Sequence, residues 1–272
     1  MQFEAAELPD DLASLIEAVF HYKGFFPEHS IERVVPTGHV FVLFELDGME
    51  RSTYDDDGQV TGTFSDAWIS GLQRTPLSIS AHPDSEMFVI QFKGAGALPF
   101  LHTGLSEFSE TVRPGAAVLG GELIGLRQQL HQQPSSAAKF EVALGWLRAR
   151  FRKELLPPDA LLAVVRDLEN SPGAQFASIV SNYPHTPKHL IDQFQKYLGV
   201  TPKVYQRILR FNEIFQYLQQ HKEVGWAAVA AHCGYADQSH FIREFKHFCG
   251  FNPEEFLREG HDVDEPNFFP LN

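Results

Sequence analysis

Histidine and cysteine are the residues best suited to bind a metal or to act as a nucleophile, and this chain has 13 histidines and two cysteines. A metal site of the β-barrel type usually needs two histidines one residue apart. No His-x-His occurs, and His39, His82 and His102 stand alone. Cys233 falls at an apolar position of a predicted helix, which is typical of a small core residue. The chain also lacks the Gly-x-Ser-x-Gly, Walker and dinucleotide-binding glycine patterns. The sequence therefore predicts no enzyme, no metal and no cofactor.

Side chains suited to recognition lie near the carboxyl end, on one face of a helix predicted over 238–249. Phe241 and Phe245 have the spacing of a buried stripe, so the residues beside them point outward. The outward face carries Gln238, Ser239, Ile242 and Arg243. Their amide, hydroxyl and guanidinium groups can hydrogen-bond to an ordered polar surface, although a solvated helix face has the same composition.

The same residue pattern occurs twice in the last part of the chain. Apolar and aromatic residues at i, i+3, i+4 and i+7 in 226–233 follow a matching set in 176–183 by 50 positions. The offset becomes 51 further on, where 199–205 aligns with 250–256. Each copy has the form of a short helix, a turn and a second helix, and a helix predicted over 202–220 connects the two copies.

The turn that follows each copy explains why these particular residues repeat. Gly199 and Gly250 can take the left-handed conformation that ends a helix. Thr201 and Asn252 can cap the next helix, whose first position holds a proline in both copies. The agreement of so many specialised positions indicates a structural repeat.

The chain before residue 158 divides into a β-rich part and a helical part. Residues 34–46 are rich in β-branched and aromatic residues and predict a strand after a Pro-Thr-Gly turn. From Leu119 the apolar spacing becomes helical and predicts two helices before Pro157-Pro158, which either cap the β-rich part or form a dimerisation face. Further strands are predicted at 67–70, 77–81 and 87–92. Short strands at this spacing favour a sandwich or barrel.

Residues from about 158 to 259 resemble the DNA-binding domain of AraC/XylS-type transcription regulators. The most specific match covers 230–246, with its Gly-Tyr turn and its Gln-Ser-His-Phe step, and continues through 250–256. The N-terminal part resembles, less closely, the small β-rich sensor domains of some members, through Pro-Thr-Gly at 36–38 and Phe-Lys-Gly-Ala-Gly at 92–96. The proline expected in that second motif is absent.

The resemblance fixes the expected fold and domain limits. The fold class is α+β with two domains: an N-terminal β-sandwich or half-barrel with trailing helices, then an all-α tandem helix-turn-helix of seven helices. The predicted limits are 1–110 for a β-rich sensor or dimerisation domain, 111–157 for its helical extension, 158–260 for the DNA-binding domain and 261–272 for an acidic tail.

The resemblance also implies that the second helix of each unit faces bases and phosphates of DNA. Glutamine can pair with adenine, isoleucine can contact a thymine methyl group, and arginine or lysine suits guanine or phosphate. In the second unit the predicted DNA-binding residues are Gln238, Ser239, His240, Ile242, Arg243 and Lys246.

The first unit is less usual because it carries an acid on the outward face. Its predicted DNA-binding residues are Thr186, Lys188, His189, Ile191, Asp192 and Lys196. Asp192 is unfavourable beside phosphates unless it accepts a hydrogen bond, for example from cytosine N4. Either Asp192 reads a cytosine or this unit docks loosely while the second supplies most base contacts, and we favour loose docking.

Charge and composition permit this function without indicating it. The net charge is −13, but residues 171–259 hold nine basic and eight acidic residues, so the acidity belongs to the N-terminal part and the tail. The sequence has no run of about 18 uncharged apolar residues that would predict a membrane span. It also has no positively charged leader that would predict secretion, and two thiols suit the cytoplasm. The alternative function is a ligand-binding or protein-interaction regulator whose helical domain has lost DNA binding. A third alternative, less favoured, is an N-terminal enzyme fused to a regulator.

The expected partners are double-stranded DNA, RNA polymerase, a small-molecule effector and a second copy of the chain, without a membrane. The family activates more often than it represses, so we expect an activator. An apolar or aromatic effector could enter a pocket in the β-rich domain, although the same residues also suit an ordinary core. The predicted pocket residues are Phe41, Phe44, Trp68, Phe88 and Phe92.

Overall fold

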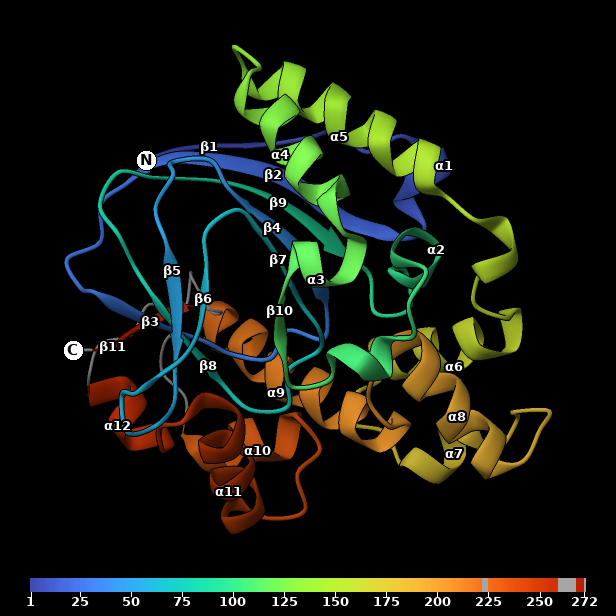
Figure 1. Cartoon of the computed structure of the whole chain (residues 1–272). Helices are drawn as coiled ribbons and strands as arrows, with labels where there is room; N and C mark the ends of the chain where they lie inside the picture. Colours follow the sequence, from blue (N-terminus) through green and yellow to red (C-terminus); the bar gives the residue numbers. More distant parts are fainter. Residues whose placement is uncertain (222–224, 259–267, 272) are drawn as a thin grey trace.

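The computed structural model describes residues 1–221, 225–258 and 268–271 (Figure 1). Strands of the N-terminal half and the last described strand form two antiparallel sheets. The first sheet has the order β1 (Gln2–Ala5), β2 (Ile16–Phe25), β9 (Ser85–Phe92), β4 (Val40–Glu45), β7 (Ala67–Ser70) and β10 (Val112–Pro114). The second has the order β11 (Phe268–Leu271), β3 (Ile31–Val34), β8 (Leu77–Ser80), β5 (Arg51–Tyr54) and β6 (Val60–Phe64).

The alternation of side chains gives the first sheet two different apolar faces. Phe44 and Phe88 belong to the main core, which lies under the helices. Val89, next to Phe88 in sequence, and Trp68, opposite Leu43 in register, belong to a separate cluster on the face turned to the second sheet. The predicted sandwich or half-barrel is confirmed, with its interior between the two sheets.

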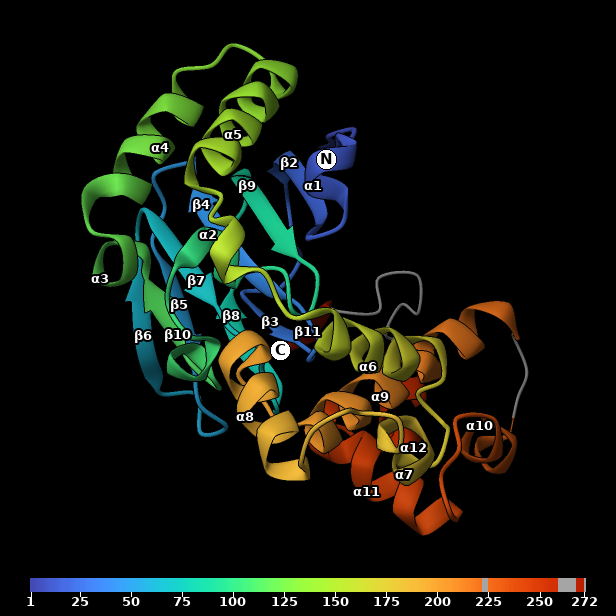
Figure 2. The same cartoon turned by 90° about the vertical axis from the view of Figure 1, so that its right-hand side faces the viewer.

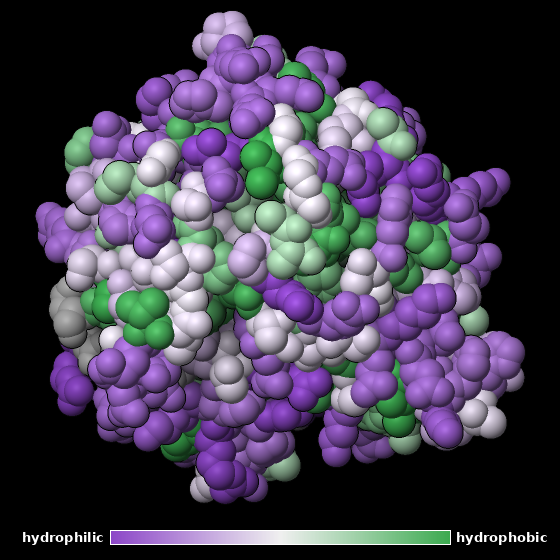
Figure 3. Space-filling model, in the orientation of Figure 1, coloured by the Kyte–Doolittle hydropathy of each residue, from purple (hydrophilic) through white to green (hydrophobic). Residues whose placement is uncertain are grey.

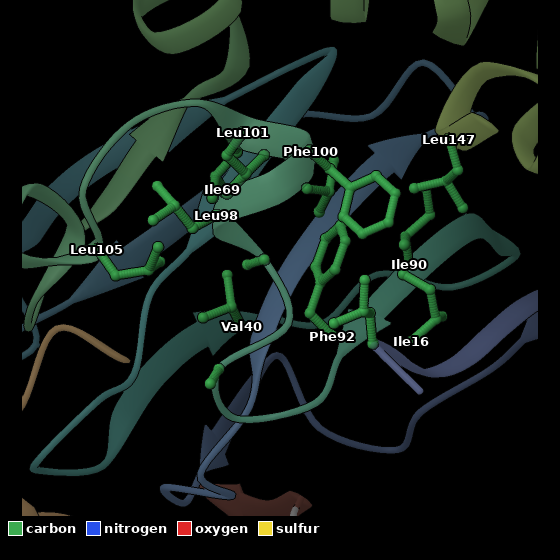
Figure 4. Packing of buried hydrophobic residues seen from close by; sticks show 14 of the residues in the cluster. Ile16, Val40, Ile69, Ile90, Phe92, Leu98, Phe100, Leu101, Leu105 and Leu147 are labelled. Atoms are coloured by element: carbon green, nitrogen blue, oxygen red, sulfur yellow. The ribbon is translucent and has the colours of Figure 1, made fainter. Parts of the chain in front are cut away.

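Helices α4 (Gly121–His131) and α5 (Ser136–Arg150) lie across the first sheet, as Figures 1 and 2 show. They follow the short helices α1 (Asp10–Ala13), α2 (Leu98–Leu101) and α3 (Gly115–Leu119). Leu123 and Leu126 of α4 and Leu144 and Leu147 of α5 are buried in the main core. The two helices predicted there therefore cap the β domain, and Figure 4 shows Leu147 beside Ile90 and Phe100 in that core.

Seven helices follow in the described residues, the number expected from the family resemblance. They are α6 (Asp159–Asn170), α7 (Phe176–Val180), α8 (Pro187–Leu198), α9 (Pro202–Gln220), α10 (Trp226–His232), α11 (Gln238–Cys249) and α12 (Pro253–Arg258). Gly199 and Gly250 end α8 and α11 in the left-handed conformation, with φ of 80° and 85°. Thr201 and Asn252 accept backbone N–H bonds at the starts of α9 and α12. The repeat is therefore structural.

The β domain and the helices share one hydrophobic core. The main core continues from the first sheet through Leu161, Phe194 and Tyr205 of the helical domain. Tyr205 packs on one glycine of each N-terminal motif: a Cβ at Gly94 would lie 2.5 Å from the Tyr205 hydroxyl, and one at Gly38 3.4 Å from its ring. The Pro-Thr-Gly and Phe-Lys-Gly motifs thus form the surface on which the helical domain docks.

The fold differs from expectation in its strands and in its tail. Strands β1, β5, β6 and β10 lie outside the predicted strands, and β3 overlaps the strand predicted over 34–46 only at Val34. Strand β2, the longest strand described, was not predicted, because its polar residues include His21, which is buried and hydrogen-bonded to Ser136 and Glu86. The predicted acidic tail ends in a strand, since β11 pairs antiparallel with β3. Its apolar residues Phe268–Leu271 carry the signal for a strand. The tail's acids at 262, 264 and 265 lie outside the described residues.

A buried ion cluster links β4 and β5 at one end of the sheets. Arg51 donates to Glu45 and to Asp47 at 2.9 Å each, and the indole N–H of Trp68 donates to Glu45 at 2.8 Å. The Glu45 and Arg51 side chains are 0% and 4% exposed. Burial raises the pKa of Glu45 to about 7, against the lowering effect of Arg51.

Replacing Arg51 with methionine should destabilise the fold by about 3–5 kcal/mol, because it leaves buried carboxylates unpaired. The pKa of Glu45 in the folded protein lies above its ordinary value of 4.5, so Glu45 holds a proton near pH 5 and loses it as the pH rises through 7. The substitution should therefore reduce the free energy of unfolding least near pH 5 and most above pH 7. Chemical denaturation at pH 5 and pH 8 measures both effects. The control is Arg148→Met, which breaks a solvent-exposed pair with Asp11 and should cost much less stability. An equal loss in both variants would contradict this account.

Candidate nucleic-acid interface

The second helix-turn-helix unit is built on stacked aromatic side chains. Trp226 of α10 stacks on Phe241 of α11 with ring centroids 5.6 Å apart, and Phe245 lies 5.8 Å from Phe211 of α9. Phe241 and Phe245 are fully buried, as their helical spacing predicts. The buried stripe therefore fixes which face of α11 is turned outward.

The turn between α10 and α11 has a position that only glycine fits. Gly234 has φ of 71°, and a Cβ there would lie 2.7 Å from the carbonyl oxygen of Gly173. The next helix starts at a cap, where Asp237 accepts the backbone N–H of His240 at 2.7 Å. Because Gly173 lies between α6 and α7, this turn also packs the second unit against the first.

The outward face of α11 is open along its length. Gln238, Ser239, Arg243 and Lys246 are exposed, and Ile242 is 38% exposed although it is a large apolar residue. The sixth predicted residue differs: the ring of His240 is half-buried and lies 5.5 Å from Tyr235, edge to face. Their contact with DNA remains a prediction.

The first unit presents α8 in the same way. The hydroxyl of Thr186 caps α8 by accepting the N–H of His189 at 3.2 Å. The other predicted residues of this helix, Lys188, Ile191, Asp192 and Lys196, are exposed. His189 is half-buried, because Nδ1 hydrogen-bonds to the hydroxyl of Tyr183 at 2.9 Å and the rings stack. His189 and His240 occupy equivalent places in the repeat and are both held by a tyrosine.

The two units differ in how well they are packed. Val229 and Cys233 of the second unit are fully buried, whereas the equivalent Ile179 and Tyr183 are only half-buried and α7 contains no buried residue. An apolar cavity of about 310 Å³ lies beside α7 and α8, lined by residues such as Phe176 and Leu190. The first unit is therefore the less rigid platform for α8.

Repeat equivalence pairs the outward residues of the two second helices. Ile191 of α8 and Ile242 of α11 are equivalent and are 39% and 38% exposed. Asp192 is equivalent to Arg243, and both are exposed. The units thus share an apolar contact point but carry opposite charges at the following position.

Two arginines of α9 hold the second unit in place through contacts inside the domain. Arg207 donates two hydrogen bonds to Glu244 of α11, at 2.7 and 2.8 Å. Burial works to raise the pKa of Glu244, but the Arg207 guanidinium holds that pKa below its ordinary value. Arg210 lies over the ring of Tyr235 at 5.5 Å. Glu244 was not among the predicted site residues, because its partner lies 37 positions away in sequence.

Both units project from the body of the protein. Figure 1 places α7 and α8 near one end of α9 and α10 and α11 near the other. In the space-filling view of the same face, a notch at the lower edge separates the two regions, and the surface around it is mostly hydrophilic (Figure 3). The connecting helix therefore spaces two exposed second helices.

The predicted effector pocket is only partly formed by the residues that the sequence singled out. Two adjoining cavities of about 70 and 80 Å³ lie between the sheets, and Phe41 and Trp68 line both. Phe44, Phe88 and Phe92 are buried on the opposite face, in the core under the helices. Strand alternation explains the difference, since it turns these three rings away from the interior.

The three isolated histidines have structural partners. His39 donates to the carbonyl of Phe92 at 3.1 Å, and burial lowers its pKa. His82 and His102 donate to the carbonyls of Glu50 and Arg150. Within residues 1–221, 225–258 and 268–271 there is no group of three or more His, Cys, Asp or Glu placed to hold a metal. In the same residues no helix has the length and apolar character needed to cross a membrane.

Two protein families match different parts of the chain. Residues 184–259 match a family described as helix-turn-helix domain, and residues 9–114 match a domain of unknown function (DUF6597). The first match contains α8 to α12, and the second contains β2 to β10. The division agrees with the two regions described above.

Similar proteins include HTH-type transcriptional activators. The HTH-type transcriptional activator RhaS of Escherichia coli O157:H7 (strain EC4115 / EHEC) is 23% identical over 128 residues, which cover 47% of this chain and 38% of that protein. RhaS of Pectobacterium carotovorum subsp. carotovorum (strain PC1) is 23% identical over 163 residues, 59% of this chain and 51% of that protein. The chain spans about half or less of the length of these relatives. The structure of unsaturated fatty acid bound wild-type ToxT from Vibrio cholerae strain SCE256 is 12% identical, with a TM-score of 0.46 over 90% of this chain and 95% of that one.

Substituting Gly234 with alanine should destabilise the second unit by more than about 1 kcal/mol, because the new methyl group meets the Gly173 backbone and the left-handed φ is strained. The matched control is Gly145→Ala in α5, where nothing lies within 4 Å of the new atom. That change should stabilise by about 0.5–1 kcal/mol. Thermal unfolding and amide exchange in α11 measure the effects. Equal stability of the two variants would show that the turn does not constrain the unit.

Proposed function

Because its carboxyl-terminal domain is a tandem helix-turn-helix of the AraC/XylS type, we propose that this chain is a sequence-specific DNA-binding transcription regulator that activates its target genes. The observation that carries the proposal is the pair of capped second helices, α8 and α11, whose outward faces are exposed on either side of one connecting helix. A helix presented in this way suits the major groove of DNA.

The second unit supplies most of the base contacts. Gln238 and Ser239 stand in the first turn of α11, the part of a recognition helix that reaches base edges. Ile242 offers an apolar surface to a thymine methyl group, and Arg243 offers a planar donor to guanine or phosphate. The Arg207–Glu244 pair acts through positioning, because it fixes the rotation of α11 against α9.

The first unit docks loosely and adds phosphate contacts from Lys188 and Lys196. Two observations support this assignment. The unit is less completely packed, and its exposed acid Asp192 stands where the second unit has Arg243. An acid near phosphates costs electrostatic energy unless a base donates to it.

A small apolar or aromatic molecule acts as effector from the cavities between the two sheets. Phe41 and Trp68 give those cavities an aromatic lining, and Arg51 and His82 stand at the edge of one of them. An apolar cavity of about 150 Å³ is enough to bind benzene. Each of these two cavities is smaller, so we place the effector across both of them, over the side chains that they share. The protein works in the cytoplasm, as two buried cysteines that form no disulfide suit, with RNA polymerase and a second copy of the chain as partners.

A regulator that no longer binds DNA is the alternative, and specific observations favour it. Arg207 and Arg210 are engaged inside the domain, so the outward faces have few cations. The chain as a whole carries a net charge of −13. Selection of bound duplexes from a random pool separates the two functions, because a regulator without DNA binding enriches no sequence.

Replacing Arg243 with alanine should weaken binding to the selected duplex by about 1–3 kcal/mol and relax the preference at one base pair. Replacing Lys246 should weaken binding to all sequences and reduce the slope of log K against log salt by about 1. Gel shifts with a salt titration measure both. The control is Arg152→Ala, an exposed arginine of the N-terminal half, which should leave affinity unchanged. Unchanged binding in all three variants would remove α11 from the interface.

Substituting Asp192 with alanine should strengthen binding to most sequences, because it removes a negative charge that faces phosphates. The same gel shifts on the selected duplex and on variants at each cytosine test this. A loss of affinity confined to one cytosine-bearing site would instead establish direct reading by Asp192.

A further inference from the structure

The last described strand connects two parts of the molecule that the proposed function treats separately. β11 (Phe268–Leu271) forms the edge of the second sheet and pairs with β3 along its whole length, from Phe268 opposite Val34 to Leu271 opposite Ile31. Adjacent residues of a strand point to opposite faces. Phe268 and Phe269 therefore project to different sides of this edge.

Phe269 enters the core of the second helix-turn-helix unit. It is fully buried, and its ring lies 5.0 Å from Phe256 of α12 and 5.8 Å from Phe215 of α9, measured between centroids. Phe256 in turn lies 5.6 Å from Phe245 of the recognition helix α11. A residue from the N-terminal half, Val35, belongs to the same cluster.

Phe268 lies on the other side, against the interior of the β domain. It lines both cavities between the sheets, together with Phe41, Leu43, Trp68 and Ile79. Phe268 is 48% exposed to solvent. The ring thus covers the cavities from the edge of the sheet.

Strand β3 reinforces the connection from its own side. Arg33 lies over the ring of Phe251 with 5.0 Å between the guanidinium carbon and the ring centroid. Its guanidinium occupies the space that a side chain at Gly250 would need, directly at the end of α11. The edge formed by β3 and β11 therefore holds the second unit at two places.

We propose that β11 is a two-sided latch that couples the cavity of the β domain to the packing of the second helix-turn-helix unit. A molecule in the cavity that packs against Phe268 keeps β11 paired with β3. While β11 is paired, Phe269 stays in the core beneath α11 and α12. Loss of the contact with Phe268 releases Phe269 and loosens the recognition helix. The proposal deepens the proposed function, because it gives an effector in the cavity a route to α11.

Amide hydrogen exchange of the full chain tests the latch without DNA. Phe268→Ala removes a ring from the cavity side only, yet exchange in α11 and α12 should become at least about threefold faster, because the strand opens more often. Phe269→Ala should speed exchange in β3 and β8, on the opposite side from the altered ring. The matched control is Phe26→Ala, a phenylalanine that is 67% exposed, which should change neither region.

If Phe268→Ala fails to fold, the conservative variant Phe268→Leu replaces it. Phe268→Leu should also speed exchange in α11 and α12, by a smaller factor. Two results together would overturn the latch. Exchange in α11 and α12 would be unchanged by a substitution at Phe268, and exchange in β3 and β8 would be unchanged by a substitution at Phe269. Gel shifts of the same variants separate this result from the proposed function. A chain that enriches no duplex but shows the reciprocal exchange effects has the latch without the DNA-binding activity.

Discussion

Burial of one face of helix α9 is the constraint on which the rest of the structure depends. Tyr205 at its beginning belongs to the core shared with the β domain, while Ile208, Phe211 and Phe215 belong to the core of the second unit. Each fully buried side chain of this kind contributes about 1.5–3 kcal/mol. Both helix-turn-helix units and the β domain therefore pack on one rigid element, and the spacing of α8 and α11 follows from its length.

Polar contacts then set orientations that apolar packing leaves open. Gln206 is buried in α9 and donates to the carbonyls of Pro172 and Ala174, which fixes the turn between α6 and α7. Arg207, the next residue, fixes α11 through Glu244. Consecutive residues of α9 thus position the two units, the first from its turn and the second from its recognition helix. A buried donor such as Gln206 is costly to leave unpaired, so these contacts specify one arrangement.

The repeat made the helical domain predictable, because its signals are local. A glycine that ends a helix, a cap and a first-turn proline each depend on a few neighbouring residues, and Gly199 and Gly250 behave as predicted. The exposure of Ile242 and Arg243 followed from the same periodicity. The β domain was harder, since strand pairing is not local: β2 was missed, and Phe44 and Phe88 could not be assigned to the helix side of the sheet until the helices were placed over it. The partner of Glu244 and the return of β11 to β3 depend on tertiary structure and had no sequence signal.

Charge and packing together imply a division of labour between the two units. A near-neutral helical domain gains little from counterion release, so sequence preference has to come from fitted contacts, which need a rigid recognition helix. The second unit has that rigidity, because Phe245 is fully buried and the Arg207–Glu244 pair adds a fixed rotation. It is also the unit that the edge of the second sheet touches, through Phe269 and Arg33. The unit to which we assign most base contacts is thus the one that the β domain touches, whereas α8, with its looser core and Asp192, fits the orienting role that we propose for the first unit.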